Sequence, residues 1–164
     1  MSYRNGLMYQ RVIGTLAVFS LLVACSSKFA YPNTLAKNLH IQTETASGSP
    51  FSSVHAALGI YRVDAQCRIE YQGTIDLDNA VVSVGLPSGR PSYLVFEFAS
   101  SSFLAGSRRS ITYETLLVPA AGHDYRLEVS YVEDIYNVEI QESRPGESTP
   151  RRIIRRDLRT CLDA

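Results

Sequence analysis

The residues of this 164-residue chain that could transfer protons or bind metals are few and scattered. Its three histidines are His40, His55 and His123, and His123 is the one with an acidic neighbour, Asp124. Such a pair can form half of a metal or acid–base site, but it is more typical of a turn in which the aspartate bonds to nearby backbone amides. No nucleophile elbow, His-Glu-x-x-His run, glycine-rich phosphate loop or paired-cysteine metal knuckle occurs in the sequence. We therefore expect no catalytic residue, no metal site and no cofactor.

Three carboxylates, Glu70, Asp76 and Asp78, are separated by even numbers of residues in a segment with a two-residue period, which places them on one face of a strand. On one face of a strand, alternate side chains stand about 7 Å apart, and glycosidases use a pair of acids. Acidic residues are equally typical of the solvated face of a strand. A hydrolase is therefore the least favoured function.

The C-terminal part of the chain carries a dense group of positive charges. Five arginines fall close together: Arg151, Arg152, Arg155, Arg156 and Arg159. They could contact anionic lipid head groups or an acidic partner protein. They could equally form the charged edge of a sheet, which discourages pairing with other strands. The sequence does not decide between the two.

A second candidate contact lies in the loop from Ser100 to Ser110. It contains Phe103 and Leu104 in its middle and Arg108 and Arg109 near its end. Loops at the ends of β-sandwiches commonly carry binding residues. These four residues are therefore a second candidate interaction site.

The N-terminal residues combine two isolated positive charges with one apolar run. Arg4 and Arg11 precede a stretch from Val12 to Ala24 that only three small or polar residues interrupt. This is the layout of a secretory signal, with a positive start, an apolar centre and a small residue before the cleavage point. The run has 13 residues, whereas a helix needs about 20 to span a bilayer.

The end of this signal, Leu22-Val23-Ala24-Cys25, closely resembles the lipobox of bacterial lipoproteins. In that family the thiol of the cysteine is diacylated, the chain is cut just before it, and the new amino group is often acylated. The resemblance covers residues 1–25 and implies that Cys25 carries the lipid. In the same family a serine after the cysteine, here Ser26, points to the outer membrane. The alternatives are a membrane-spanning helix with a chance cysteine and a cleaved but unlipidated signal.

If Cys25 carries lipid, two cysteines remain, Cys67 and Cys161. A lone pair in an oxidising periplasm usually forms a disulfide. It would close a loop of about 95 residues, for which chain entropy predicts a stabilisation of roughly 4 to 5 kcal/mol. Two buried free thiols are the alternative. A metal site is disfavoured because neither cysteine has a second ligand at the usual spacing.

Composition narrows the class of the mature protein. Cleavage before Cys25 leaves 140 residues, enough for one domain with its own hydrophobic core. The whole chain has 16 basic and 16 acidic residues, and the signal removes Arg4 and Arg11, so the mature chain has a formal charge of −2. This balance gives no reason to expect nucleic acid as a partner. Ten tyrosines, no tryptophan and many β-branched residues favour strands.

A two-residue hydrophobic period runs from residue 38 onward and predicts a series of β-strands. The clearest strand covers residues 67–78, where one buried face would hold Cys67, Ile69, Tyr71, Gly73, Ile75 and Leu77. A glycine on that face suggests a bulge or a bend. Residues 93–99 are nearly all apolar and predict a central strand buried on both faces.

Turn residues recur at short intervals between these segments, so we predict an all-β fold. The expected architecture is an immunoglobulin-like or transthyretin-like β-sandwich of about 7–9 mostly antiparallel strands. It would occupy residues 38–164, after a signal peptide at 1–24 and a lipidated N-terminus and tether at 25–37. Residues 150–162 could be an edge strand that brings Cys161 beside Cys67, which we favour. They could also be a helix that Thr149 caps and Pro150 starts.

The function we expect is that of an outer-membrane-anchored periplasmic lipoprotein with a non-catalytic structural or protein-interaction sandwich. Its partners would be the membrane, through the N-terminal lipid, and an envelope protein or anionic lipid. A small-ligand or glycan-binding module of the envelope is the alternative. A sandwich fold by itself does not decide among these functions.

Overall fold

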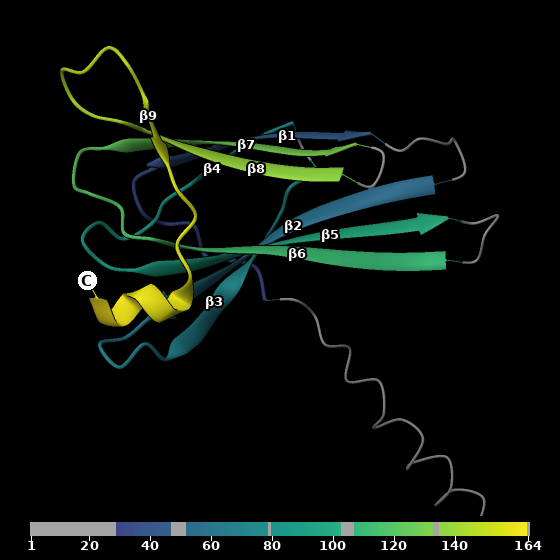
Figure 1. The fold of residues 1–164 in the computed structure, drawn as a ribbon, viewed down its shortest axis with the longest axis horizontal. Helices are drawn as coiled ribbons and strands as arrows, with labels where there is room; N and C mark the ends of the chain where they lie inside the picture. The colour runs from purple at the N-terminus through teal and green to yellow at the C-terminus, as the bar shows by residue number, and fades with distance from the viewer. Residues whose placement is uncertain (1–28, 47–51, 79, 103–106, 133–134, 164) are drawn as a thin grey trace, which may run out of the picture.

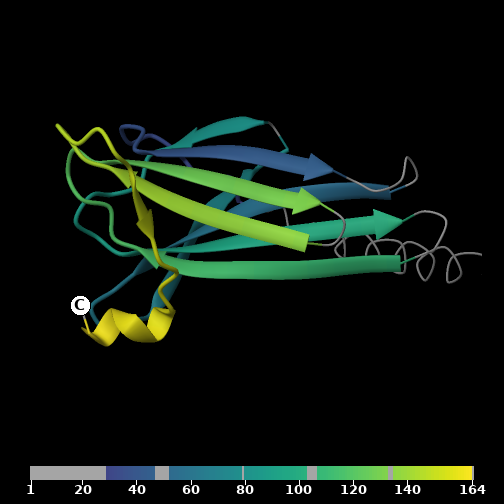
Figure 2. The same ribbon diagram turned by 45° about the horizontal axis from the view of Figure 1, so that its top comes forward.

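The computed structural model describes residues 29–46, 52–78, 80–102, 107–132 and 135–163, which form two β-sheets packed face to face (Figures 1 and 2). The elements are β1 (Leu39–Ala46), β2 (Ser52–Val63), β3 (Ile69–Asp76), β4 (Val81–Val84), β5 (Ser92–Ser102), β6 (Ser107–Leu117), β7 (Asp124–Val132), β8 (Ile135–Ser143), β9 (Arg151–Ile153) and the 3-10 helix η1 (Leu158–Asp163). One sheet has the order β4-β1-β7-β8-β9 and the other β3-β2-β5-β6. Among these named strands β1 and β7 are the one parallel pair, so the predicted, mostly antiparallel β-sandwich is confirmed.

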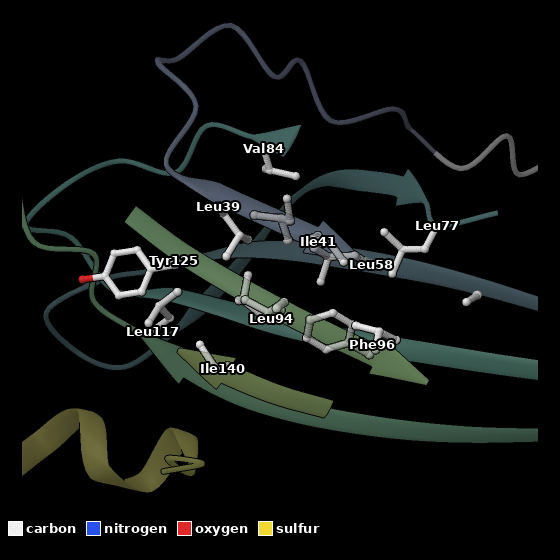
Figure 3. Packing of buried hydrophobic residues seen from close by; sticks show 14 of the residues in the cluster. Leu39, Ile41, Leu58, Leu77, Val84, Leu94, Phe96, Leu117, Tyr125 and Ile140 are labelled. Atoms are coloured by element: carbon white, nitrogen blue, oxygen red, sulfur yellow. The ribbon is translucent and has the colours of Figure 1, made fainter. Parts of the chain in front are cut away.

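The core lies between the two sheets and is filled by alternate residues of their strands. Leu39 and Ile41 of β1 and Leu127 of β7 face Leu94 and Phe96 of β5, and all five side chains are fully buried. Figure 3 shows Leu39, Ile41, Leu94 and Phe96 among the side chains that fill the space between the two sheets. Burial of each such side chain contributes roughly 2 kcal/mol. The two-residue period of β1 and β7 therefore marks the side chains that face the core, as the sequence predicted.

The predicted burial of residues 93–99 on both faces holds for one half of β5 only. Leu94, Phe96 and Phe98 face the core, and Tyr93 on the outer face is also buried. Glu97, further along that outer face, is exposed. The difference arises because C-terminal residues, including Leu158 and Cys161, cover the outer face near Tyr93 and leave the face around Glu97 open.

A β-bulge in β3 changes which side chains face the core. Gly73 and Tyr71 pair with consecutive residues of β2, so Gln72 is extra in β3. One extra residue reverses the alternation on its N-terminal side. Gly73 is buried, whereas Ile69 and Tyr71 are 46% and 41% exposed on the outer face. The predicted bulge near Gly73 is confirmed, but the expectation that Ile69 and Tyr71 share its buried face is wrong.

Residues 29–38, most of which were expected to be a tether, pack along the edges of both sheets; we call them the N-terminal segment. The Thr74 amide donates to the Phe29 carbonyl at 2.8 Å, and the Tyr31 amide donates to the Thr74 carbonyl at 3.0 Å. Further along, the Gly85 amide donates to Asn33 Oδ1 at 2.9 Å. The described part of the expected tether is therefore held against the sandwich by hydrogen bonds from its backbone and from the Asn33 side chain.

Two glycines permit this close approach. Gly73 has φ +138°, and a Cβ atom there would lie 2.5 Å from the backbone nitrogen of Tyr31. A Cβ atom at Gly85 would overlap the Leu35 carbonyl group. Any other residue at either position would push the N-terminal segment away from the sheets.

The C-terminal residues begin with the favoured edge strand, and the alternative helix that Thr149 would cap and Pro150 would start is absent there; a 3-10 helix forms only later, at η1. β9 is the expected edge strand, but it is short, pairs with Ile140–Glu142 of β8 and lies in the five-stranded sheet. The expectation that this strand lies beside Cys67 is wrong, because Cys67 precedes β3 in the other sheet. After β9 the chain crosses to the four-stranded sheet, where η1 holds Cys161 in a disulfide with Cys67 (Figure 1). The predicted disulfide is therefore present, with a Cα–Cα distance of 5.9 Å.

Residues 151–163, which we call the C-terminal strap, run from the edge of the five-stranded sheet to the outer face of the four-stranded sheet, where their second half covers part of that face. Val63, Tyr93 and Leu116 form a second, smaller apolar cluster there, and Leu158 and Cys161 pack against it. The Tyr93 hydroxyl donates to Glu114 Oε2 at 2.6 Å. Burial and this carboxylate both raise the pKa of Tyr93.

Candidate functional site

The C-terminal strap bridges the two sheets on the side between β6 and β8 (Figure 2). β9 is hydrogen-bonded to β8, and three residues later the Leu116 amide of β6 donates to the Arg156 carbonyl at 2.9 Å. The Arg156 amide also donates to Thr115 Oγ1 at 3.3 Å. The strap therefore closes one half of this side of the sandwich, and the first halves of β6 and β8 continue beyond it.

A hollow of about 490 Å³ lies where the strap crosses from one sheet to the other. Its apolar lining comes from Tyr113 of β6, Val138 of β8 and the strap, and its polar lining is Glu139, Arg152 and Arg155. Ile154 forms part of its rim and is 82% exposed. An apolar side chain between two positive groups would fit such a site, and a carboxylate beside that side chain would pair with the arginines.

The hollow is not a tyrosine-lined ligand pocket, because Tyr113 is its one tyrosine. Tyr125 and Tyr131 are core residues with exposures of 1% and 3%. Tyr61 and Tyr71 pack against each other on the outer face of the four-stranded sheet, with ring centroids 5.2 Å apart. The described tyrosines are thus distributed over core and surface and do not gather around one cavity.

The arginine cluster predicted from the sequence is divided between structural and free positions. Arg152 lies 3.7 Å from Glu139, and the Arg155 guanidinium lies 5.1 Å from the centre of the Tyr113 ring. Arg155 Nε also donates to the Glu114 carbonyl at 2.8 Å. Arg151 and Arg159 are exposed, and the Arg159 backbone amide donates a hydrogen bond to Asp157 Oδ1. Replacing all the arginines together would therefore remove stabilising contacts as well as surface charge.

The second candidate contact lies only partly within the described residues. Phe103 and Leu104 lie outside them. Arg108 and Arg109 are exposed at the start of β6, in register with Ser101 and Ser100 of β5. These arginines stand at the end of the β5–β6 hairpin and are not among the residues that line the hollow.

His123 and Asp124 do not act together. His123 Nδ1 lies 3.0 Å from Glu142 Oε1, which also accepts a hydrogen bond from the Tyr125 hydroxyl. Asp124 instead lies 3.9 Å from His40 Nε2, beside a separate hollow of about 350 Å³. The pKa of Glu142 is lowered chiefly by the His123 hydrogen bond. This group joins the turn before β7 to the end of β8, which is a structural arrangement.

The bulge separates Glu70 from the other two carboxylates of the predicted acidic face. Glu70 pairs with Arg62 of the neighbouring strand. Asp76 and Asp78 both approach His55, whose Nδ1 lies 2.9 Å from an Asp78 oxygen and whose Nε2 lies 3.6 Å from Asp76. These side chains are all largely exposed, and none of them lines either hollow.

Among the described residues, no group of three or more His, Cys, Asp or Glu side chains could hold a metal ion. The same part of the chain contains no helix with the length and hydropathy that a membrane crossing requires. Cys25, the expected lipidation site, lies outside the described residues.

The residues that line the hollow include three that the sequence did not single out, Tyr113, Val138 and Glu139. They come from β6 and β8, which are far apart in the chain, and each belongs to an ordinary alternating strand. The pattern of each strand alone carries no signal of the hollow, because the hollow exists only where the strap crosses between them. Comparison with known proteins found no family model that matches the chain and no curated protein that matches it.

Proposed function

We propose that the chain is the precursor of a lipoprotein of the bacterial cell envelope, anchored through Cys25 to the periplasmic side of the outer membrane. The lipobox-like Leu22-Val23-Ala24-Cys25 supports the anchor. The Cys67–Cys161 disulfide supports an oxidising compartment and leaves Cys25 as the cysteine without a disulfide partner. Ser26 supports outer-membrane sorting.

The mature sandwich acts as a non-catalytic module that binds another envelope protein. The observation that carries this proposal is the hollow beside the C-terminal strap, with its apolar lining and its two arginines. Exposed apolar groups that are bordered by charge are typical of protein contacts. Arg152 and Arg155 outnumber the one carboxylate that lines the hollow, Glu139, and therefore favour a partner whose contacting segment is acidic.

The anchor is tested by mass spectrometry of protein extracted from membranes of the expressing bacterium. The N-terminal peptide should begin at Cys25 and carry acyl chains, and Cys25→Ser should leave the protein unprocessed or release it from the membrane. Two or three acyl chains give firm anchoring, because each buried methylene contributes roughly 0.8 kcal/mol. A mature N-terminus elsewhere in the chain, without lipid, would disprove the anchor.

The interaction is tested by cross-linking in whole cells with two matched variants. Ile154→Asp places a negative charge at the rim of the hollow, and Ile135→Asp places one on β8 outside it; the two isoleucines are 82% and 73% exposed. Ile154→Asp should reduce the yield of the cross-linked partner about tenfold, the effect of losing roughly 1.4 kcal/mol at an interface. Equal yields from the two variants would exclude the hollow as the binding site.

A further inference from the structure

We propose that, in the lipid-anchored protein, the outer face of the four-stranded sheet around β3 lies against the bilayer, with Phe29, Ile69 and Tyr71 in contact with lipid. We call these three residues the β3 patch. This inference rests on the proposed lipidation of Cys25. It adds an orientation: the domain is held on the membrane by one defined face.

The first argument is the position at which the chain joins the sandwich. From Phe29 onward the backbone is hydrogen-bonded to Thr74 of β3, through bonds of 2.8 and 3.0 Å. Only Ser26, Ser27 and Lys28 separate Phe29 from Cys25. Four residue steps span at most about 14 Å even when fully extended. A lipid on Cys25 would therefore keep the β3 edge within that distance of the bilayer surface.

The second argument is the kind of side chain that this edge exposes. Phe29, Ile69 and Tyr71 are 63%, 46% and 41% exposed, and the Tyr71 hydroxyl lies 3.4 Å from the Phe29 carbonyl oxygen. The bulge at Gln72 places Ile69 and Tyr71 on the outer face, because it reverses the alternation of β3. Aromatic and aliphatic side chains together are typical of protein surfaces that insert into the boundary between head groups and acyl chains.

The third argument is charge. Two ion pairs lie beside Ile69 and Tyr71: Arg62 with Glu70, and Arg68 with Asp64, at 2.7 Å between Arg68 Nε and Asp64 Oδ2. Each of these two pairs is neutral overall, so at this end of β3 they add no net negative charge that anionic head groups would repel. Asp76 and Asp78 lie at the other end of β3, next to His55. The second sheet lies about 10 Å farther from the membrane, so exposed apolar residues there, such as Ile135 of β8, would stay in water.

The chain contains no tryptophan, so single tryptophans can report on each face. Phe29→Trp and Ile69→Trp place the probe in the β3 patch, and Ile135→Trp is the control, at a position that is 73% exposed in the other sheet. Each full-length variant is purified in its lipidated form. It is then reconstituted in phosphatidylethanolamine–phosphatidylglycerol vesicles whose acyl chains are brominated near the head group. Bromine quenches tryptophan fluorescence only at short range.

We expect quenching of about twofold or more for Phe29→Trp and Ile69→Trp and little for Ile135→Trp, because only the first two probes would enter the interface. Inserting about ten Gly and Ser residues before Phe29 should weaken the quenching, since a flexible linker lets the domain move away. Vesicle-bound, acylated protein with equal quenching at all three positions would overturn the orientation while leaving the anchor intact. Protein that carries no acyl chain would overturn the anchor and the orientation together.

Discussion

Removing the Cys67–Cys161 disulfide should lower the free energy of unfolding by about 3 to 4 kcal/mol. The bond joins residues 94 positions apart, and chain entropy for a loop of this length gives an upper value of about 4.7 kcal/mol. Native disulfides usually contribute somewhat less than this model predicts, since the unfolded chain is more compact than an ideal one. The expected loss therefore lies below the upper value but remains large for one domain.

The structure also predicts where the reduced protein opens first. Without the disulfide the C-terminal strap is held by β9, by the Leu116–Arg156 hydrogen bond and by partial burial of Leu158. A few such contacts are each worth about 1 kcal/mol. Local detachment of the strap should therefore precede global unfolding and expose Tyr93 and Leu116.

The assay is equilibrium unfolding in guanidinium chloride, followed by far-ultraviolet circular dichroism. Residues 26–164 with both cysteines intact are compared with the Cys67→Ser, Cys161→Ser double variant. Hydrogen exchange at the Leu116 amide is measured in parallel, and this amide should exchange much faster in the variant. A loss below about 1 kcal/mol, together with unchanged exchange at Leu116, would show that the strap is held independently of the disulfide and would refute this reasoning.

Two further predictions concern the packing of the N-terminal segment and the loss of folding stability at acidic pH. Gly73→Ala should cost about 2 to 3 kcal/mol, because it combines an unfavourable φ with a clash against Tyr31. Gly89→Ala, where φ is +71° and nothing lies within 4 Å, should cost only about 1 kcal/mol; equal costs in chemical denaturation would argue against the close approach. The pKa of Glu142 is lowered from its ordinary value of 4.5 by hydrogen bonds from His123, Tyr125 and Arg144. Its contribution to stability is therefore present above about pH 4.5 and is lost as the pH falls through the lowered value, so Glu142→Gln should flatten the acid limb of a stability–pH curve; an unchanged limb would contradict this role.

Several features of the protein were determined by the sequence alone. Apolar residues at alternate positions, such as Leu39 and Ile41 or Tyr125 and Leu127, predicted strands with one buried face, and these side chains are buried. The alternation can be seen in neighbouring residues alone. It predicts burial because a strand with one apolar face is stable only when another layer covers that face. The disulfide could also be predicted, since assigning Cys25 to lipid left a single pair.

The tertiary structure decided how these elements face one another. Bulge formation near Gly73 could be predicted, but its reversal of Ile69 and Tyr71 depends on the pairing with β2, which no local pattern contains. The same holds for the turn at His123, whose partner Glu142 comes from the end of β8. In both cases the sequence contains the interacting side chains, and the register between strands determines which of them meet.

The ends of the chain depended most on tertiary structure. A strand of three residues at β9 and a 3-10 helix at η1 are too short to have a reliable period of their own, so the sequence of residues 150–162 fitted both a strand and a helix. Their conformation is set by the surfaces that they cover, β8 at one end and the cluster of Val63, Tyr93 and Leu116 at the other. Residues 25–37 were likewise predicted to be a tether, and those that the structure describes pack against the sheets, where Gly73 and Gly85 leave room for their backbone. Contacts of this kind join residues that are distant in the chain, and single-sequence patterns report only on neighbours.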